Sequence, residues 1–251
     1  MAIVLKSTRE LESMQRAGRV VATVLAEIEE KLVPGQTTKQ IDEIAERTVA
    51  RLGARASFKG LYGFPASICI SLNEEIVHGI PSPTRVLKEG DIVSLDFGAV
   101  LDGLHADAAV TLPVGRVSEE ARRLLNCCQT ALERGIGQAR SGRRLGDISW
   151  AIQSYGEAKG YGIVRQYVGH GVGRDLHEEP QVPNFGQPGR GVALRPGMTL
   201  AIEPMLNVGT EKTAVLEDKW TVVTEDRRLS AHFEHTVAVT EDEPLVLTRL
   251  E

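Results

Sequence analysis

The feature that most constrains the fold of this chain is an internal repeat with a constant offset of 107 residues. The stretch Gly90–Asp96 is echoed by Gly197–Glu203, and each reads as a turn, a short apolar strand and a carboxylate at the strand end. Three further pairs share the offset: Gly35 with Gly142, Ile41 with Ile148 and Gly53 with Gly160. A repeated unit fixes an architecture before any other pattern does. We predict two halves, at about 7–113 and 118–240, within a single domain spanning 1–251.

Hydrophobic periodicity places helices ahead of strands in both halves. The first half predicts helices over 7–33 and 38–52, a strand over 66–71, a loop-rich passage over 73–83, and a hairpin of strands 91–100 and 104–113. The second half predicts helices over 118–136 and 145–159, a strand ending at Glu203, and strands near 212–216, 220–224 and 231–240. Because strands and helices do not alternate, this order favours an α+β fold with helices on the outer face of a curved, mostly antiparallel sheet.

Charge and composition exclude several classes of protein. With 29 basic and 34 acidic residues, the net charge of −5 argues against a nucleic-acid-binding surface. The longest apolar run near the start, 20–26, is too short to span a bilayer, and the first residues lack the pattern of a signal peptide. The three cysteines do not form a spaced, even-numbered framework, which favours a reducing compartment. We therefore expect a cytoplasmic protein that binds neither nucleic acid nor membrane directly.

Two carboxylates of the predicted hairpin indicate a cation site. Asp96 and Asp107 point to the same face in either register that the turn near Asp102 allows, because side chains alternate along a strand. Two like charges side by side repel each other, and a cation between them removes the repulsion. Two exposed aspartates are the ordinary alternative. The apolar neighbours on both strands argue against it, because they predict a buried hairpin.

Three more side chains complete a candidate ligand set. His170 lies in a glycine-rich loop that also carries His177, Glu203 closes its apolar strand, and Glu234 lies in another apolar strand. Four carboxylates with one imidazole suit Mn, Fe or Co better than a structural zinc. Their negative charge balances two ions better than one, and paired ions about 3.5–4 Å apart activate water in hydrolases.

Seven motifs carry a resemblance to a known family. They are NEEIVHGIP at 73–81, DIVSLD at 91–96, DGLHAD at 102–107, GHGVG at 169–173, HEEP at 177–180, PGMT at 196–199 and EPM at 203–205. In this order they resemble the bacterial type I methionine aminopeptidases, over about residues 5–240. The resemblance implies the pita-bread fold, which agrees with the repeat. It also implies a metal-dependent hydrolase that removes the initiator methionine from nascent proteins, during translation, when the second residue is small.

The resemblance also implies a role for each residue of the motifs. Asp96 would hold one divalent ion, His170 and Glu203 the other, and Asp107 and Glu234 would bridge them. Glu203 would in addition shuttle the proton. His177 would bind the scissile carbonyl oxygen, and His78 would assist the leaving nitrogen. By itself, His78 reads more readily as an ordinary loop histidine.

Pocket residues follow from the resemblance in the same way. Phe64, Cys69 and Trp220 match the lining of the methionine pocket, although each is equally compatible with an ordinary core position. The chain departs from the common family pattern at Phe58, Leu61 and Leu176, which changes the expected shape of the pocket. Asn73 and Ser230 occupy positions where the family holds a monovalent cation.

Two other functions remain compatible with the pattern. One is a related enzyme acting before proline, although such chains carry an additional N-terminal domain and the first predicted helix begins here at Ser7. The other is a pita-bread protein that has lost catalysis and acts as a binding module, which would lack ligands that this chain retains. The expected partners are the N-termini of nascent polypeptides, with transient contact to the ribosome, and the expected state is a monomer.

Overall fold

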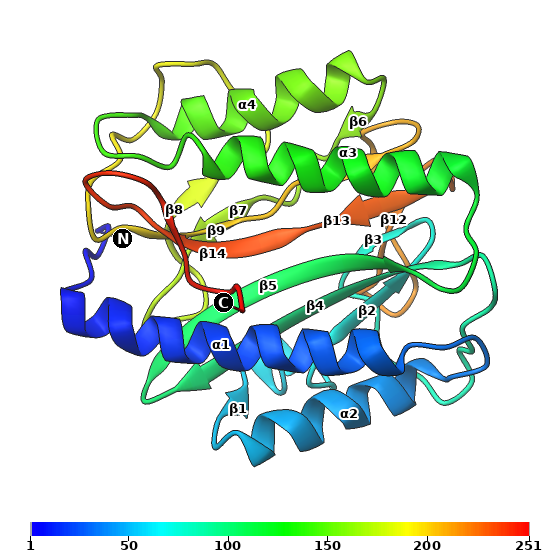
Figure 1. Ribbon diagram of the computed structural model, residues 1–251. Coiled ribbons are helices and arrows are strands. Elements are labelled where there is room, and N and C mark those ends of the chain that lie inside the picture. Colours follow the sequence, from blue (N-terminus) through cyan, green and yellow to red (C-terminus); the bar gives the residue numbers. More distant parts are fainter. Residues whose placement is uncertain (1, 251) are drawn as a thin grey trace.

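The computed structural model describes residues 2–250, which form four α-helices and a set of short and long strands (Figure 1). The helices are α1 (Thr8–Lys31), α2 (Thr38–Arg51), α3 (Glu119–Ile136) and α4 (Leu145–Ala158), with a 3-10 turn η1 (Leu61–Gly63). The strands of the first half are β1 (Arg55–Ala56), β2 (Cys69–Leu72), β3 (Glu75–Val77), β4 (Ile92–Leu101) and β5 (Leu104–Pro113). Those of the second half are β6 (Gly162–Ile163), β7 (Gly169–Gly171), β8 (Glu178–Val182), β9 (Thr199–Ile202), β10 (Met205–Asn207), β11 (Thr213–Val215), β12 (Val222–Thr224), β13 (Ser230–His232), β14 (Glu234–Ala238) and β15 (Leu245–Val246).

The first two helices begin where their sequences supply a cap. Ser7 accepts a hydrogen bond from the backbone N–H of Glu10, whose carboxylate accepts one from the N–H of Ser7. Thr37 and Gln40 make the same reciprocal pair at the start of α2. Each capping box satisfies two backbone donors that have no partner within the helix. Both predicted helix starts are therefore confirmed.

A large antiparallel sheet crosses the middle of the molecule. Its strands run in the order β1-β4-β5-β14-β9-β7-β8, with β2 beside β4 and β15 beside β14. The long β4–β5 hairpin turns through Asp102 and Gly103, both at positive φ, which is the backbone that a tight two-residue hairpin turn requires. In Figure 1, α1 and α2 lie below the central strands and α3 and α4 lie above them. The predicted α+β architecture is confirmed.

The offset of 107 residues recurs in the three-dimensional structure. Helix α4 begins and ends 107 residues after α2, and β6 stands at the same distance from β1. The isolated bridge between Thr37 and Val86 has a counterpart between Arg144 and Ala193. Three glycine pairs at this offset all have positive φ: Gly35 with Gly142, Gly53 with Gly160, and Gly90 with Gly197. The pseudo-twofold repeat is therefore a property of the backbone, including the turns that only glycine adopts easily.

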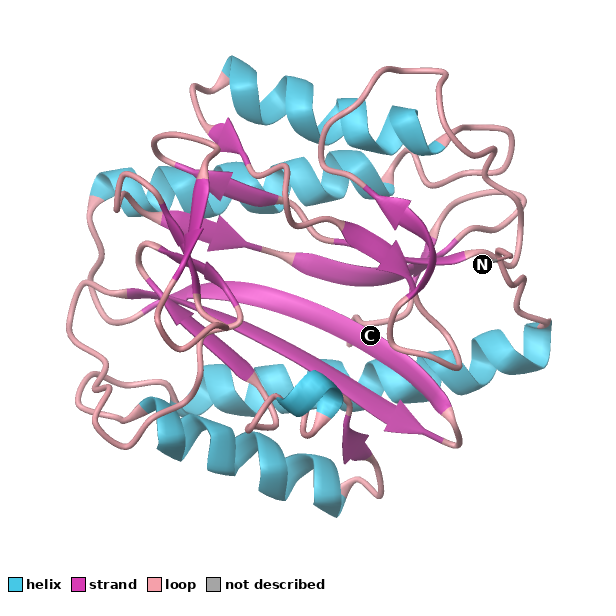
Figure 2. Cartoon of the chain, turned by 180° about the vertical axis from the view of Figure 1, so that it is seen from behind, coloured by secondary structure: helices cyan, strands magenta, loops and turns pink. Residues whose placement is uncertain are grey.

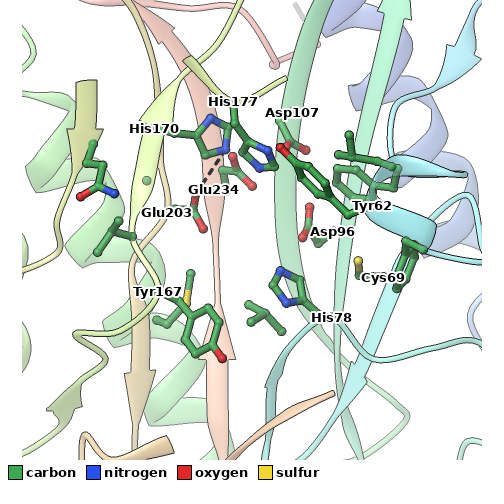
Figure 3. Close-up of a pocket in the computed structure, with 18 of the residues that line it drawn as sticks. Tyr62, Cys69, His78, Asp96, Asp107, Tyr167, His170, His177, Glu203 and Glu234 are labelled. Atoms are coloured by element: carbon green, nitrogen blue, oxygen red, sulfur yellow. Dashed lines mark ion pairs between the residues drawn. The ribbon is translucent and has the colours of Figure 1, made fainter. Parts of the chain in front are cut away.

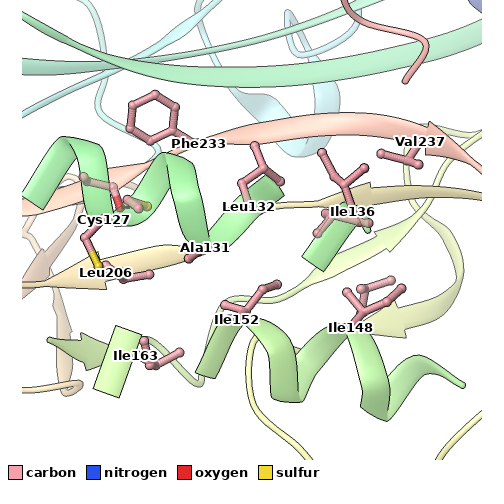
Figure 4. Close-up of a cluster of buried hydrophobic side chains, with 14 of the residues drawn as sticks. Cys127, Ala131, Leu132, Ile136, Ile148, Ile152, Ile163, Leu206, Phe233 and Val237 are labelled. Carbon is pink, nitrogen blue, oxygen red and sulfur yellow. Dashed lines mark hydrogen bonds between the residues drawn. The ribbon is translucent and has the colours of Figure 1, made fainter. Parts of the chain in front are cut away.

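Each pair of helices encloses its own apolar core against the sheet. Buried side chains of α1 and α2 pack with those of β4 and β5, among them the fully buried Phe97. The second core packs α3 and α4 against β9, β10 and β14; Figure 4 shows Leu132, Ile136, Ile148 and Ile152 at its centre. Burial of this kind contributes about 25 cal/mol per Å² of apolar surface. Among residues 2–250, no helix combines the length and apolar character needed to cross a membrane.

Several predicted strands are wrong in detail. The strand predicted over 66–71 begins only at Cys69, and the predicted loop at 73–83 contains β3. The strand predicted over 231–240 is broken at Phe233, because β13 pairs with β10 in a small sheet whereas β14 pairs with β9 and β5 in the large one. Asp96 does not close its strand, as the repeat suggested, but lies within β4. The ends of these strands depend on which strands pair with one another, and a local sequence pattern does not specify that pairing.

Candidate metal centre and active site

One cavity of about 500 Å³ collects all the residues predicted to bind divalent metal, to act in catalysis or to line the methionine pocket (Figure 3), whereas Asn73 and Ser230 do not line it. The residues that it collects are Phe64, Cys69, His78, Asp96, Asp107, His170, His177, Glu203, Trp220 and Glu234. They come from both halves of the repeat: Cys69, Asp96, Asp107, His170 and Glu234 lie in strands of the large sheet, and the others lie outside the strands. Figure 2, seen from behind, shows the loops and short strands that lie on the side of the sheet opposite to that viewed in Figure 1.

Three adjacent strands set the acidic side chains in a row. Asp96 of β4 stands opposite Ala109 of β5, and Ala109 stands opposite Glu234 of β14. Asp107 lies two residues before Ala109, so its side chain points to the same face. The small side chain of Ala109 leaves space between the carboxylates. The predicted common orientation of Asp96 and Asp107 is confirmed.

Burial dominates the electrostatics of these carboxylates. It raises the pKa of Asp107 to about 7. Burial, followed by the charge of Asp107, raises the pKa values of Asp96, Glu203 and Glu234 well above the usual range. Each group therefore resists ionisation unless a cation compensates its charge. An exposed pair of aspartates, the ordinary alternative, is excluded because Asp107 is only 3% exposed.

The second half positions His170 and Glu203. His170 lies in β7 opposite Ala201 of β9, and Glu203 follows the end of β9, where its carbonyl accepts a hydrogen bond from Asn184. The Nδ1 of His170 lies 2.8 Å from the carbonyl oxygen of Gly171. Since a carbonyl can only accept, Nδ1 carries the proton and Nε2 presents a lone pair. That Nε2 lies 3.6 Å from Oε1 of Glu203. Burial lowers the pKa of His170 to about 4, which keeps the ring neutral at pH 7.

The arrangement fits divalent metal ions. Ligand atoms of Asp107, His170 and Glu234 all lie within 4.8 Å of one another. One oxygen on each of Asp96, Asp107 and Glu234 is buried without a hydrogen-bond partner among the described residues. A buried carboxylate oxygen without a partner is costly, and a cation removes that cost. Oxygen ligands with one imidazole are the donors that Mn, Fe and Co accept.

Two further histidines face the cavity from its rim. His78 has a φ of 62°, a left-handed backbone that turns its ring toward Tyr167, with 5.8 Å between the ring centroids. His177 packs edge-on against His170 at 4.4 Å and lies parallel to Tyr62 at 6.4 Å. Burial lowers the pKa of His78 to about 4 and also lowers that of His177. Both rings are therefore neutral at pH 7, with one nitrogen as a hydrogen-bond donor.

An apolar pocket adjoins the acidic row, which is formed by Asp96, Asp107 and Glu234 on β4, β5 and β14. Its buried members are Phe58, Phe64, Ala66, Cys69 and Leu176, with Leu61, Ile80 and Trp220 packed against them. Phe64 and Trp220 make an edge-to-face contact with centroids 5.2 Å apart. Cys69 stands directly opposite Asp96, which links the pocket to the acidic row. Of the three positions of departure, Phe58 and Leu61 line the cavity, and Leu176 packs in the same apolar cluster.

Three residues near the cavity were missed by the sequence analysis. Tyr62, exposed and at positive φ, lies over His177, and Tyr167 packs against His78. His232 is buried, and its Nε2 lies 3.7 Å from Oε2 of Glu203. Tyr62 lies in the short stretch Gly60-Leu61-Tyr62-Gly63, and Tyr167 lies three residues before His170; these were the signals available. For His232 only the pairing of β13 with β10 brings the ring beneath Glu203.

Comparisons with known proteins agree with this geometry. Residues 12–241 match the model of metallopeptidase family M24. The chain is 52% identical to methionine aminopeptidase 1 of Bacillus subtilis, over 99% of this chain and 100% of that protein. It is also 50% identical to the methionine aminopeptidase of Clostridium perfringens, again over 99% and 100%.

Solved structures give the same result. The structure of methionine aminopeptidase from Thermotoga maritima superimposes with a TM-score of 0.98 at 46% identity, over 99% of this chain and 100% of that one. Prolidase from Pyrococcus furiosus shares the fold, with a TM-score of 0.79 at 21% identity, and the chain covers 66% of its length. The chain therefore belongs to metallopeptidase family M24 and, within that family, to the methionine aminopeptidases.

Proposed function

We propose that this chain hydrolyses the first peptide bond of polypeptides that begin with methionine, and so releases free methionine. The observation that carries the proposal is the meeting, in one cavity, of a buried acidic row, two neutral histidines and an apolar pocket. The acidic row suits divalent ions, and the pocket suits one unbranched apolar side chain. Membership of the methionine aminopeptidases supports the same reaction.

Five residues would hold two divalent ions. Asp96 would bind one, His170 and Glu203 the other, and Asp107 and Glu234 would bridge them. Bound there, the ions would polarise the scissile carbonyl and lower the pKa of a water molecule. Cobalt, manganese and iron all match the donor set. Asn73 and Ser230 stay candidates for a monovalent cation, since the N–H of Ser230 donates to the carbonyl of Asn73 and the Ser230 hydroxyl is buried without a partner among residues 2–250.

Protein side chains would then move protons and stabilise charge. Glu203 would take a proton from water and pass it to the leaving nitrogen, because its raised pKa suits both steps. His177 would donate a hydrogen bond to the scissile carbonyl oxygen, where negative charge develops. His78, on the opposite rim, would contact the backbone after the scissile bond. Burial keeps both rings neutral at pH 7, and a neutral imidazole still donates one hydrogen bond through its single N–H.

The pocket would select methionine by shape and polarisability. Phe64, Cys69 and Trp220 present an aromatic and sulfur surface, which a flexible thioether fills better than a branched side chain does. The next substrate residue would lie beside the acidic row and His78, which favours a small side chain there. We further propose that the enzyme acts on nascent chains in the cytoplasm, as a monomeric single domain in transient contact with the ribosome.

Release of methionine from short peptides tests the proposal. Protein loaded in turn with cobalt, manganese and iron is supplied with Met-Ala-Ser and with Leu-Ala-Ser, and free amino acids are measured. We expect methionine from the first peptide and negligible leucine from the second. A Met-Leu-Ser peptide should be cleaved poorly because its second residue is large. A protein inert with all three metals would instead be a binding module of the same fold.

A further inference from the structure

We propose that Lys6 is a positioning residue for His177 and acts through a buried ion pair with Glu178. This inference rests on the proposed function, since it assigns His177 a role in turnover. The two partners of the pair are 172 residues apart in the chain. Nζ of Lys6 lies 2.5 Å from Oε2 of Glu178, and the two side chains are 3% and 10% exposed.

The N-terminal segment is fixed so that Lys6 points inward. The backbone N–H of Lys6 donates to the carbonyl of Gly197 at 2.7 Å, in the turn that leads to β9. Its ammonium donates to Glu178 and to the carbonyl of Val4 at 3.2 Å. A lysine is rarely buried, and here the carboxylate and the carbonyl replace part of its hydration.

Glu178 transmits this constraint to the loop before it. Its second oxygen, Oε1, accepts hydrogen bonds from the backbone N–H of Arg174 at 2.8 Å and of Asp175 at 3.3 Å. These contacts close the loop that joins β7 to β8, and His177 is the last residue of that loop. The carboxylate therefore holds both ends of the segment from which the His177 ring reaches the cavity.

The backbone of the same loop packs tightly against the ion pair at Gly173. A Cβ added to Gly173 would lie 2.4 Å from Cε of Lys6 and 2.5 Å from Oε1 of Glu178. A side chain at 173 would therefore displace the ends of Lys6 and Glu178, so the backbone at 173 lies directly over the buried pair. The carbonyl of Gly173 also accepts a hydrogen bond from the N–H of His105 at 2.8 Å.

The expected effect is confined to His177. His170, on the same hairpin, is held independently by the pairing of β7 with β9. His177 lies outside both strands, so its position depends on the loop. A buried ion pair contributes little net stability compared with apolar residues of similar size, whereas loss of one partner leaves a costly unpaired charge. Positioning is therefore the better explanation for a buried lysine here.

Steady-state kinetics of Lys6→Met tests the proposal, with Met-Ala-Ser as substrate and manganese as the metal. We expect kcat to fall about 10- to 100-fold while KM changes less than about threefold. Bound manganese per chain should equal that of the wild type. Lys6→Arg should restore most of kcat, because it returns a buried cation. Arg174→Ala is the matched control: it removes an exposed ion pair with Glu10 from the same loop and should leave kcat unchanged.

A double-mutant cycle separates positioning from general stability. In a His177→Ala background, Lys6→Met should lower kcat no further, because its effect passes through the missing ring. Full additivity of the two losses would overturn the proposal, as would wild-type kcat in Lys6→Met. If Lys6→Met does not fold, Lys6→Met/Glu178→Gln, which leaves no unpaired charge, takes its place in the cycle.

Hydrogen exchange tests the proposal without reference to turnover. In Lys6→Met, the amides of Arg174 and Asp175 should exchange faster, whereas those of β9 should not. Unchanged exchange at 174–175 would overturn the inference even in an active enzyme. Inertness of the wild type toward both peptides would overturn the proposed function alone, and the exchange result would still decide whether Lys6 holds the loop.

Discussion

At the scale of single residues, the acidic row has an arrangement that the protein alone does not stabilise. Burial raises the pKa values of Asp96 and Glu234 well above the usual range, and each leaves an oxygen without a partner among the described residues. The backbone nevertheless holds these groups in strand register. A native fold that gathers acids at such a cost indicates that cations compensate them.

Substitution of the central carboxylate tests its role as a bridge. Asp107 belongs to the three-residue ligand cluster, and, together with burial, its charge raises the pKa values of Asp96, Glu203 and Glu234. Asp107→Asn should therefore lower the affinity for both ions, so that well under one ion per chain remains after dialysis. The measurement is metal analysis of dialysed protein. Asn184→Ala, which removes only a contact to the carbonyl of Glu203, provides a comparison outside the ligand set. Retention of two ions by Asp107→Asn would show that Asp107 does not bridge.

His177 should affect turnover and not metal content. Its ring packs against His170 but belongs to no ligand cluster among the described residues. We expect His177→Ala to keep the wild-type metal content and to lose about 10²–10³-fold in kcat, the usual cost of removing an oxyanion donor. Single-turnover kinetics with metal analysis of the same sample measures both. An emptied metal site would mean that His177 is a ligand.

At the scale of elements, the helices of the first half are joined by one carboxylate. Glu27 of α1 contacts Lys31 on its own helix at 2.5 Å, and Thr48 and Arg51 of α2 at 2.9 and 2.6 Å. Hydrogen bonds from Lys31 and then Thr48 lower the pKa of Glu27 to about 2. Because the folded pKa lies below the ordinary 4.5, the stabilisation is complete above pH 4.5 and is lost as pH falls toward 2.

The expected outcome for Glu27→Gln is therefore pH-dependent. At pH 7 it should lower the free energy of unfolding by about 0.5–1 kcal/mol, the size usual for partly exposed pairs. The difference from the wild type should shrink steadily below about pH 4. Urea denaturation at several pH values measures it, with the exposed Glu30→Gln as the control. A pH-independent difference would assign the effect to packing instead of charge.

The broken strands also belong to this scale. Glu203 stands at the interruption between β9 and β10, and Glu234 begins β14 directly after the break at Phe233. At the first break the chain passes from the large sheet to a small one, and at the second it passes from that small sheet back to the large one. These two carboxylates of the second half thus lie where the chain changes sheets, and both line the cavity.

At the scale of the whole molecule, the two halves meet at the candidate metal site, so metal binding there should stabilise the entire fold. The metal-free folded protein holds carboxylates with raised pKa values, and that of Asp107 is about 7. These acids keep their protons in the folded state up to about pH 7, whereas in the unfolded chain they ionise near about pH 4. The metal-free folded protein therefore loses stability as pH rises from about 4 toward 7. Bound metal removes that loss. The difference in Tm between manganese-loaded and chelated protein should therefore be larger at about pH 8 than at about pH 5.5.

Differential scanning calorimetry of both forms measures this difference, and Asp107→Asn provides the comparison. Chelated Asp107→Asn should be more stable than the chelated wild type at about pH 8, because one repelling charge is gone. Equal Tm values for the chelated proteins at all pH values would contradict the role assigned to burial.

Local patterns predicted much of this molecule. The starts of α1 and α2, the β4–β5 hairpin and the shared face of Asp96 and Asp107 follow from patterns within a few residues. Strand boundaries such as that at Phe233 did not follow, because they depend on which strands pair across large sequence separations. His232 was missed for the same reason, whereas Tyr62 and Tyr167 were missed because only the fold brings them against His177 and His78.

The sequence by itself determined the repeat, the helix starts, the family and the acidic side chains of the candidate metal site, since each is encoded in local order or in motifs. Only the tertiary structure decided which distant residues touch. It placed His232 beneath Glu203, set Ala109 between Asp96 and Glu234, and buried Lys6 against Glu178 across 172 residues of chain. Side-chain contacts over such separations depend on the packed arrangement of the whole chain, and spacing along the sequence does not contain that information.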